Sequence, residues 1–262
     1  MDAPHLNARL PVIPWLDPPA WRLPGLQPLG DAPWLMRTDS FAAQMALRDR
    51  LIAEATDRVH ALRPEAEEAA RECLDLVLAT LDPAYSRDGT RVTRPDGIAV
   101  DIDPAQPLLT AGQLVQEDLC LMVPGSAEHR LGGAILCFPA GWSLDEKIGR
   151  PLTRIHAPIR EYDDDLARRV QRVFDGIRVE RPMWRANAIL HHTAELHTPR
   201  READPVVRRP DAPFLRSERQ TLRRLPRTGA VVFTILTSVV RVTDLPTDAR
   251  AALEGAGIKS SF

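Results

Sequence analysis

The sequence has few cysteines, few aromatic residues and no long apolar run, and these shortages exclude several classes of protein. Its 262 residues contain three cysteines, Cys73, Cys120 and Cys137, at spacings that fit neither a disulfide framework nor a zinc site. Reduced thiols are typical of the cytoplasm, and the first residues lack the basic and apolar pattern of a signal peptide. No apolar stretch reaches the length of a membrane-spanning helix. We therefore expect a cytoplasmic protein without a membrane partner.

The chain also lacks the motifs that bind nucleotides and the charge that attracts nucleic acids. There is no Gly-x-Gly-x-x-Gly after a strand, no phosphate-binding loop and no Cys-x-x-Cys. The net charge is −2, so we expect no nucleic acid partner. What is present is 44% hydrophobic and 27% charged residues, which is typical of a globular protein. Five Trp and 24 Pro indicate extended connections rather than a purely repetitive fold.

The first forty residues differ from the rest. Residues 1–40 are rich in Pro and Trp without a helical or alternating period, which predicts an extended arm packed through its Trp side chains. Residues 41–262 are expected to form one domain. It begins with a helix over 41–62 and a second helix that starts at Arg63-Pro64-Glu65 and ends at Asp82-Pro83. We interpret residues 41–82 as a helical hairpin.

Strand signals dominate the remainder. Residues 97–102, 119–123, 131–138, 183–197 and 229–241 read as strands, with an antiparallel hairpin formed by the second and third. Residues 163–178 have the spacing of an amphipathic helix, and 214–224 are polar and partly extended. This order predicts an α+β fold, an antiparallel sheet with flanking helices. Such a sheet, curved and with helices on one side, can hold a flat apolar cofactor.

Two polar clusters are better explained by structure than by metal binding. Asp163, Asp164 and Asp165 precede a helix, where acidic residues interact favourably with the helix dipole. His191 and His192 are adjacent, so in a strand they would point to opposite faces and would not share a metal ion.

His156 is the best candidate for a cofactor ligand. It follows a Gly149-Arg150-Pro151 turn and precedes Ala157-Pro158, so the backbone on both sides is stiffened. Neutral imidazole is a good iron ligand, and a single His commonly holds an oxygen-reactive haem. The alternative is a His that packs in a loop and bonds to the backbone.

A second candidate segment is 214–229, which leads into the strongest strand. Arg216 and Arg219 are suited to binding carboxylates such as haem propionates through bidentate hydrogen bonds. Glu218 is suited to binding an ammonium group or relaying a proton. Lys147 and Arg154 are further candidates for anionic groups. For all of these, the alternative is an ordinary solvated charge.

Several short segments together resemble the haem-binding α subunit of the haem-dependent oxidative N-demethylases, a family long catalogued as a domain of unknown function. They are Val115–Leu119, Cys137–Pro139 with Trp142, Glu146–Gly149, Ile155–Pro158, Leu215–Leu222 and Gly229–Thr234. The resemblance extends over roughly residues 10 to 245.

The resemblance implies a PAS-like fold that binds haem b (heme b). It implies a monooxygenase that uses O2 to demethylate a small secondary amine such as dimethylamine, with release of formaldehyde. Electrons would come from NADPH through separate flavin and iron–sulfur reductase subunits, so a hetero-oligomer is expected. In this family His156 would be the axial iron ligand, and Glu218 and Arg219 would lie near the haem pocket. A haem-binding sensor or storage module without turnover is the alternative function, and a scaffold that has lost haem is a third.

Overall fold

The centre of the molecule is a seven-stranded antiparallel sheet. The computed structural model describes residues 3–21, 25–158, 164–205 and 212–258. The strands follow the order β1-β8-β9-β10-β6-β7-β2. They are β1 (Gln27–Pro28), β2 (His60–Leu62), β6 (Asp118–Val123), β7 (Arg130–Ile135), β8 (Met183–His191), β9 (Phe214–Arg224) and β10 (Val231–Arg241). The predicted α+β class, with a large antiparallel sheet and flanking helices, is confirmed.

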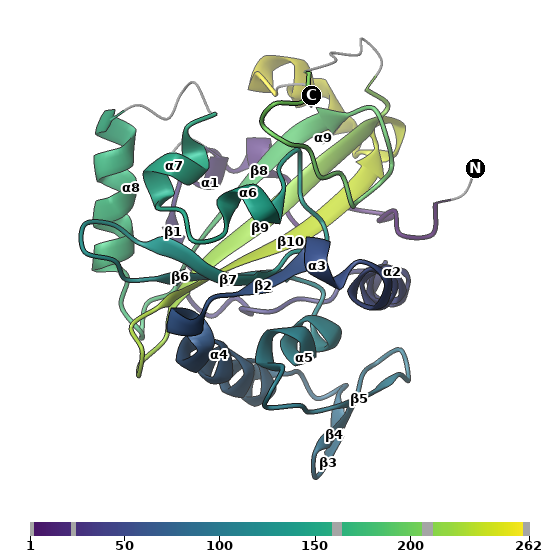
Figure 1. Ribbon diagram of the computed structural model, residues 1–262. Coiled ribbons are helices and arrows are strands. Elements are labelled where there is room, and N and C mark those ends of the chain that lie inside the picture. Colours follow the sequence, from purple (N-terminus) through teal and green to yellow (C-terminus); the bar gives the residue numbers. More distant parts are fainter. Residues whose placement is uncertain (1–2, 22–24, 159–163, 206–211, 259–262) are drawn as a thin grey trace.

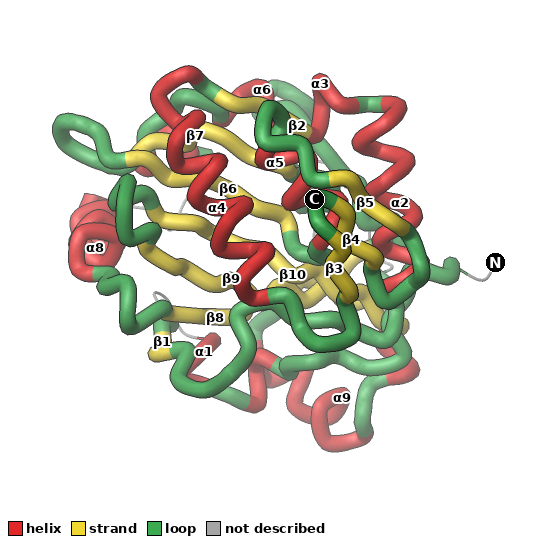
Figure 2. The backbone as a smooth tube through the Cα atoms, turned by 90° about the horizontal axis from the view of Figure 1, so that it is seen from below, coloured by secondary structure: helices red, strands yellow, loops and turns green. Residues whose placement is uncertain are grey.

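Helices cover both faces of this sheet (Figure 1). One layer consists of α2 (Phe41–Glu54), α4 (Glu67–Thr80) and α5 (Pro107–Leu114), and Figure 2 shows α4 lying across the strands. The other layer consists of α6 (Leu144–Lys147), α7 (Leu152–His156) and α8 (Asp164–Gly176). Shorter elements are η1 (Pro14–Leu16), α1 (Pro18–Trp21), α3 (Thr56–Val59), η2 (Pro64–Ala66), η3 (Val242–Asp244), α9 (Thr247–Leu253) and η4 (Glu254–Ala256). The flanking helices therefore lie on both sides of the sheet.

A second, smaller sheet projects below α5 in Figure 1. It contains β3 (Ser86–Asp88), β4 (Arg91–Thr93) and β5 (Ala99–Asp101), all antiparallel. Val92 and Val100 are its buried residues and join the main core. The strand predicted over 97–102 is thus present, but in this side sheet.

The other predicted strands lie where the structure has strands, although some differ in length. β6 and β7 form the predicted antiparallel hairpin, and β10 is the predicted C-terminal strand. β8 ends at His191, whereas the predicted strand continued to residue 197. The segment 214–224, read as only partly extended, is the full-length strand β9, paired with β10 from Phe214 to Arg224. The helix predicted over 163–178 is α8, and Asp163 lies outside the described residues.

The predicted helical hairpin at 41–82 is not confirmed. Its first helix ends at Glu54, and after the single turn of α3 the chain becomes β2, which pairs with β7. Because β2 is an edge strand of the main sheet, α2 and α4 are separated and α5 packs against both. The PAS-like topology, and the division into an arm of residues 1–40 and a domain of residues 41–262, stay predictions.

The Trp residues of the N-terminal segment contribute to the core. Trp15 is buried, and its indole N–H donates to the carbonyl of Ala249 at 2.9 Å, which ties η1 to α9. Trp34 is also buried and lies under the guanidinium of Arg223 at 5.1 Å. In place of a wholly extended arm, the structure has short helical turns at η1 and α1.

Two of the three apolar clusters among the described residues lie on opposite faces of the sheet. The larger is shared by α4, α5 and the sheet, and includes Leu74, Leu108 and Leu119. The smaller lies between the sheet and α6, α7 and α8, and includes Leu152 and Phe174. At about 25 cal/mol per Å² of apolar surface removed from water, such burial is the main contribution that fixes the layers.

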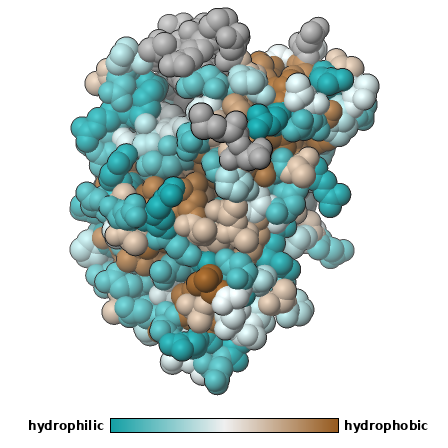
Figure 3. All heavy atoms as spheres, turned by 90° about the vertical axis from the view of Figure 1, so that its right-hand side faces the viewer, coloured by the Kyte–Doolittle hydropathy of each residue, from teal (hydrophilic) through white to brown (hydrophobic). Residues whose placement is uncertain are grey.

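The surface carries no broad apolar area on the side seen in Figure 3, where hydrophobic spheres occur in small groups between hydrophilic ones. Within the described residues, Leu16 and Ile98 are the exposed large hydrophobic side chains. None of the described helices combines the length and apolar character that crossing a bilayer requires.

Candidate functional site

The segment that carries His156 is held against the sheet by a tight turn. After α6, Gly149 adopts a φ of 73°, a left-handed conformation that suits glycine. Its N–H donates to the carbonyl of Leu131 in β7 at 2.7 Å, and the N–H of Leu131 donates to the carbonyl of Arg150 at 3.0 Å. Pro151 is the N-cap residue of α7, which ends at His156. His156 therefore lies at the end of a short helix and not, as the sequence indicated, in a loop.

The imidazole of His156 is oriented by the backbone of its own helix. Its Nδ1 lies 2.9 Å from the carbonyl oxygen of Leu152. Since a carbonyl oxygen only accepts, Nδ1 carries the proton and Nε2 carries the lone pair. Burial lowers the pKa of His156, and the positive charges of Lys147 and Arg185 lower it further, against the opposing effect of the Leu152 hydrogen bond. The ring is therefore neutral at pH 7.

Glu218 lies in the middle of a hydrogen-bonded polar cluster on the sheet. It is only 8% exposed. Its carboxylate accepts from Asn187 Nδ2 at 3.2 Å, from Gln220 Nε2 at 3.1 Å and from Arg216 Nε at 3.2 Å. Asn187 is its cross-strand partner in β8. Three donors therefore fix the position of this buried carboxylate.

Arg185 extends this cluster towards α7. It is the cross-strand partner of Gln220, and its Nη1 donates to Gln220 Oε1 at 3.1 Å. The positive charge of Arg185 helps to lower the pKa of His156. The charge of Glu218 partly opposes the lowering of the Arg185 pKa by burial. The structure thus brings His156 and Glu218, predicted from distant segments, to one layer between the sheet and α7.

Lys147 and Arg154 are near His156 in the chain, and both bind one internal carboxylate. The Nζ of Lys147 lies 2.5 Å from Glu202 Oε1, and Arg154 donates to both oxygens of Glu202 at 3.0 and 2.9 Å. Hydrogen bonds from Arg154 and Lys147 lower the pKa of Glu202 to about 2. The two side chains therefore bind a carboxylate together, and in this structure that carboxylate belongs to Glu202 of the same chain.

Arg216 and Arg219 are both used internally, on opposite faces of β9. Arg216 is fully buried and donates to the carbonyls of Leu196 and Phe138, to Thr237 and to Glu218. Arg219 donates to the carbonyls of Trp34 at 3.1 Å and Pro33 at 2.7 Å. The structure does not bring Arg219 together with His156. Successive side chains of a strand point to opposite faces of the sheet, so the sequence alone could have placed Glu218 and Arg219 on different faces.

A buried ion pair supports the floor of the site. Asp118 accepts from Arg48 Nη1 at 2.6 Å and from the backbone N–H groups of Cys137 at 2.7 Å and Phe138 at 2.9 Å. The Phe138 carbonyl in turn accepts from Arg216. Asp118 therefore fixes the loop after β7. This loop orients Arg216, and Arg216 in turn orients Glu218.

The sequence reasoning missed Arg185, Asn187 and His197. The first two alternate on one face of β8, and this alternation, Arg-Ala-Asn, was the available signal. His197 has its Nδ1 2.8 Å from the Cys137 carbonyl, and its Nε2 is buried with no hydrogen-bond partner in the part of the chain that the structure describes. No sequence pattern marked it.

The histidine pair and the cysteines behave as structural residues. The rings of His191 and His192 stack at 5.2 Å, because His192 lies beyond the end of β8, so the expectation of opposite faces is wrong. All three cysteines are buried and free, and burial raises the pKa of Cys73 and Cys137 to about 12. Within the described residues, no three His, Cys, Asp or Glu side chains are grouped to hold a metal ion.

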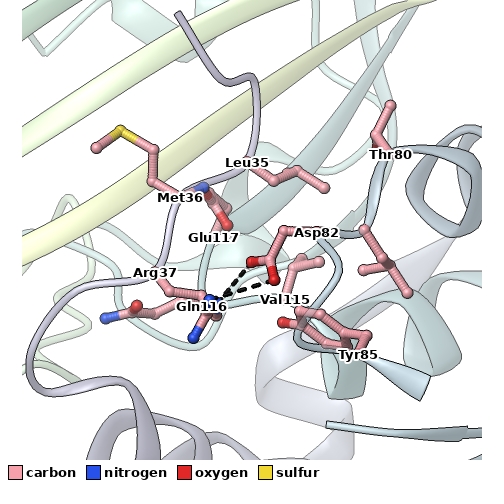
Figure 4. Close-up of a pocket in the computed structure, with 10 residues that line it drawn as sticks. Leu35, Met36, Arg37, Thr80, Asp82, Tyr85, Val115, Gln116 and Glu117 are labelled. Atoms are coloured by element: carbon pink, nitrogen blue, oxygen red, sulfur yellow. Dashed lines mark hydrogen bonds and ion pairs between the residues drawn. The ribbon is translucent and has the colours of Figure 1, made fainter. Parts of the chain in front are cut away.

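A cleft lies on the other face of the sheet, between the N-terminal segment and the end of α4 (Figure 4). Arg37 and Asp82 form an ion pair at its rim at 2.6 Å. Deeper, Glu117 accepts from the backbone N–H of Met36 at 2.7 Å through Oε1, while its buried Oε2 has no hydrogen-bond partner within the described ranges. Burial raises the pKa of Glu117 to about 7.

A family model described as "Haem-dependent oxidative N-demethylase, alpha subunit-like" matches residues 25–258. The match includes both the His156 segment and β8 to β10. No curated protein matches the chain.

Proposed function

The chain belongs to the haem-dependent oxidative N-demethylase, alpha subunit-like family, and from this membership we propose that it oxidatively demethylates a small secondary amine. In this proposal the amine is dimethylamine-like, the cofactor is haem b and formaldehyde is released. Electrons come from an NADPH-dependent reductase with flavin and iron–sulfur centres on separate subunits. The observation that supports it best is a neutral, backbone-oriented His156 in the same layer as the Glu218 cluster.

The residues present fit a haem in their chemistry. The layer between the sheet and α7 is lined by partly buried apolar side chains, among them Trp142, Ile148 and Ile155. His156 offers a neutral imidazole whose Nδ1 proton is already bound, the arrangement in which a His ligand is kept in one tautomer. When bound, the haem would supply oxygen activation and the oxidation of the N-methyl carbon.

The chain's own residues would bind and orient the reactants. His156 would hold the iron through Nε2, with Leu152 fixing the plane of the ring. Glu218, which is nearly enclosed, would accept a hydrogen bond from the substrate's amine and hold its proton. The surrounding apolar side chains would keep bulk water from the reacting carbon.

Lys147 and Arg154 are proposed to bind the haem propionates. Each already binds the carboxylate of Glu202, so a propionate would replace or share that partner. Arg216 contributes by orienting Glu218. Arg219 is not assigned to the propionates, because its guanidinium donates to carbonyls on the far face of the sheet.

The test begins with the visible spectrum. We expect the purified protein, after haem reconstitution, to show a Soret band that His156→Ala abolishes or shifts. His197→Ala is the matched control, since His197 also has Nδ1 on a backbone carbonyl. Absence of the band in the wild type would refute the haem-dependent function, and its loss in His197→Ala alone would reassign the ligand.

Turnover then separates an enzyme from a haem-binding sensor or storage module. With a reductase, dimethylamine should yield formaldehyde, and Glu218→Gln should lower this yield while the haem content is unchanged. Haem binding without formaldehyde release from any small methylamine would favour the sensor or storage function.

A further inference from the structure

Arg185 has hydrogen-bonding capacity that the described residues do not use. The guanidinium makes one hydrogen bond within the described ranges, from Nη1 to Gln220 Oε1. Its Nε is buried and has no hydrogen-bond partner there. Buried donors are rarely left unsatisfied in native proteins, because they lose their hydrogen bonds to water without replacement. An unused buried donor of this kind indicates a missing partner.

The partner that is missing should carry a negative charge. Among the described side chains of this cluster, Arg185 and Arg216 carry positive charges, and Glu218 carries the single negative one. Glu218 already accepts from Arg216 at 3.2 Å, and the neighbouring His156 is neutral. Lys147 does not alter this balance because it is paired with Glu202.

The shape of the unused edge fits a carboxylate. With Nη1 engaged by Gln220, the guanidinium presents Nε and Nη2 side by side. This edge is one of the two that bind carboxylates through a pair of parallel hydrogen bonds. A monodentate acceptor such as a hydroxyl would leave one donor unused and the charge unbalanced.

We propose that Arg185 is a carboxylate-binding residue, acting through its Nε and Nη2 edge beside His156 and Glu218. Burial lowers the pKa of Arg185, and a bound carboxylate would restore the stability of the charged form. Two sources have this chemistry. One is a propionate of the haem, and the other is a substrate that carries both a methylated amine and a carboxylate, an N-methyl amino acid.

The second source would define the substrate class. Asn187 and Gln220 place Glu218 and Arg185 as neighbours on adjacent strands. A zwitterionic substrate would then direct its ammonium to Glu218 and its carboxylate to Arg185. This inference rests on the proposed function, since both sources lie in the proposed haem site.

The experiment compares Arg185→Gln, Arg185→Lys and the wild type, with Arg50→Gln, at an exposed position of α2, as the control. Arg185→Lys keeps the charge but loses the fork, so it tests the proposal even where Arg185→Gln does not fold. Four affinities are measured. Those for haem and for its dimethyl ester come from Soret titration, and those for N-methylglycine and dimethylamine come from Soret difference spectra of the haem-loaded protein.

Each source gives a distinct result. If Arg185 binds a propionate, both variants lose about tenfold to a hundredfold in haem affinity, and the preference for haem over its ester disappears. If it binds the substrate, haem affinity is unchanged, while N-methylglycine binds about tenfold to a hundredfold more weakly and dimethylamine is unaffected. Affinities that match those of Arg50→Gln for every ligand would overturn the proposal.

Failure of the proposed function is recognised separately. If the wild type binds no haem, the haem-dependent function fails, and the carboxylate site is tested on the protein alone. Propionate ions should then raise the Tm of the wild type and of Arg50→Gln but not that of Arg185→Gln. An equal rise in all three would refute the assignment to Arg185.

Discussion

Glu117 makes the stability of this protein depend on pH in a direction opposite to that of most carboxylates. Burial raises its pKa from 4.5 to about 7, against the hydrogen bond from Met36 and the charges of Arg219 and Arg48. Between these values the folded protein binds the proton more tightly than the unfolded chain. The stabilisation is therefore complete below pH 4.5 and is lost as the pH rises through 7.

The size of the Glu117 pKa shift gives the expected change in the free energy of unfolding. A pKa shift of one unit corresponds to about 1.4 kcal/mol. Between pH 4.5 and pH 8 the wild type should therefore lose up to about 3 kcal/mol of unfolding free energy because of Glu117. Glutamine resembles the protonated carboxyl and keeps an oxygen for the Met36 N–H. Glu117→Gln should thus have nearly wild-type stability at pH 5 and exceed it by about 2–3 kcal/mol at pH 8.

Urea unfolding at pH 5, 6, 7 and 8 measures this difference. The histidines titrate in both proteins, so their contributions cancel in the comparison. Glu54→Gln, at an exposed site at the end of α2, is the control and should show no such trend. A stability difference that stays constant with pH, or that decreases towards pH 8, would refute the reasoning.

Two further predictions concern packing beneath the site. Asp118→Asn removes the charge that compensates the fully buried Arg48, and should lower the free energy of unfolding by about 3–5 kcal/mol in urea; a loss below about 1 kcal/mol would mean that the pair is not needed. In Gly112→Ala the new Cβ would lie 2.5 Å from Ile135 Cγ1, so we expect a net loss of about 1–2 kcal/mol by the same assay. Gly176→Ala, with no atom within 4 Å of its Cβ, should be neutral or slightly stabilising.

The fold could be predicted where local pattern and tertiary pairing agree. β10 is rich in Val and Thr and was identified as a strand, and the hairpin of β6 and β7 has clear turn residues between its strands. β2 could not be found, because His60, Ala61 and Leu62 have no strand propensity of their own. They become a strand through pairing with β7, where Gly133 lets Leu62 approach closely.

The residues of the candidate site could be selected from the sequence only in part. His156 stood out through its flanking prolines, and Glu218 through the polar segment that contains it. Arg185 completes the cluster from β8. The alternation Arg-Ala-Asn marks its face of that strand, but the β8–β9 register is needed to place it beside Gln220. The position of Arg219, by contrast, follows from alternation along β9 and was within reach of the sequence.

The polar strand β9 is the physical reason to look for a ligand on one face of the sheet. Arg216, Glu218 and Arg219 are all buried there, which is costly unless every charge finds a partner. On the far face Arg219 satisfies this condition with two backbone carbonyls. On the near face Glu218 has its donors, but Arg185 beside it has an unsatisfied Nε within the described residues. On the near face, next to His156, a bound carboxylate would satisfy the donor of Arg185 that the described residues leave unused.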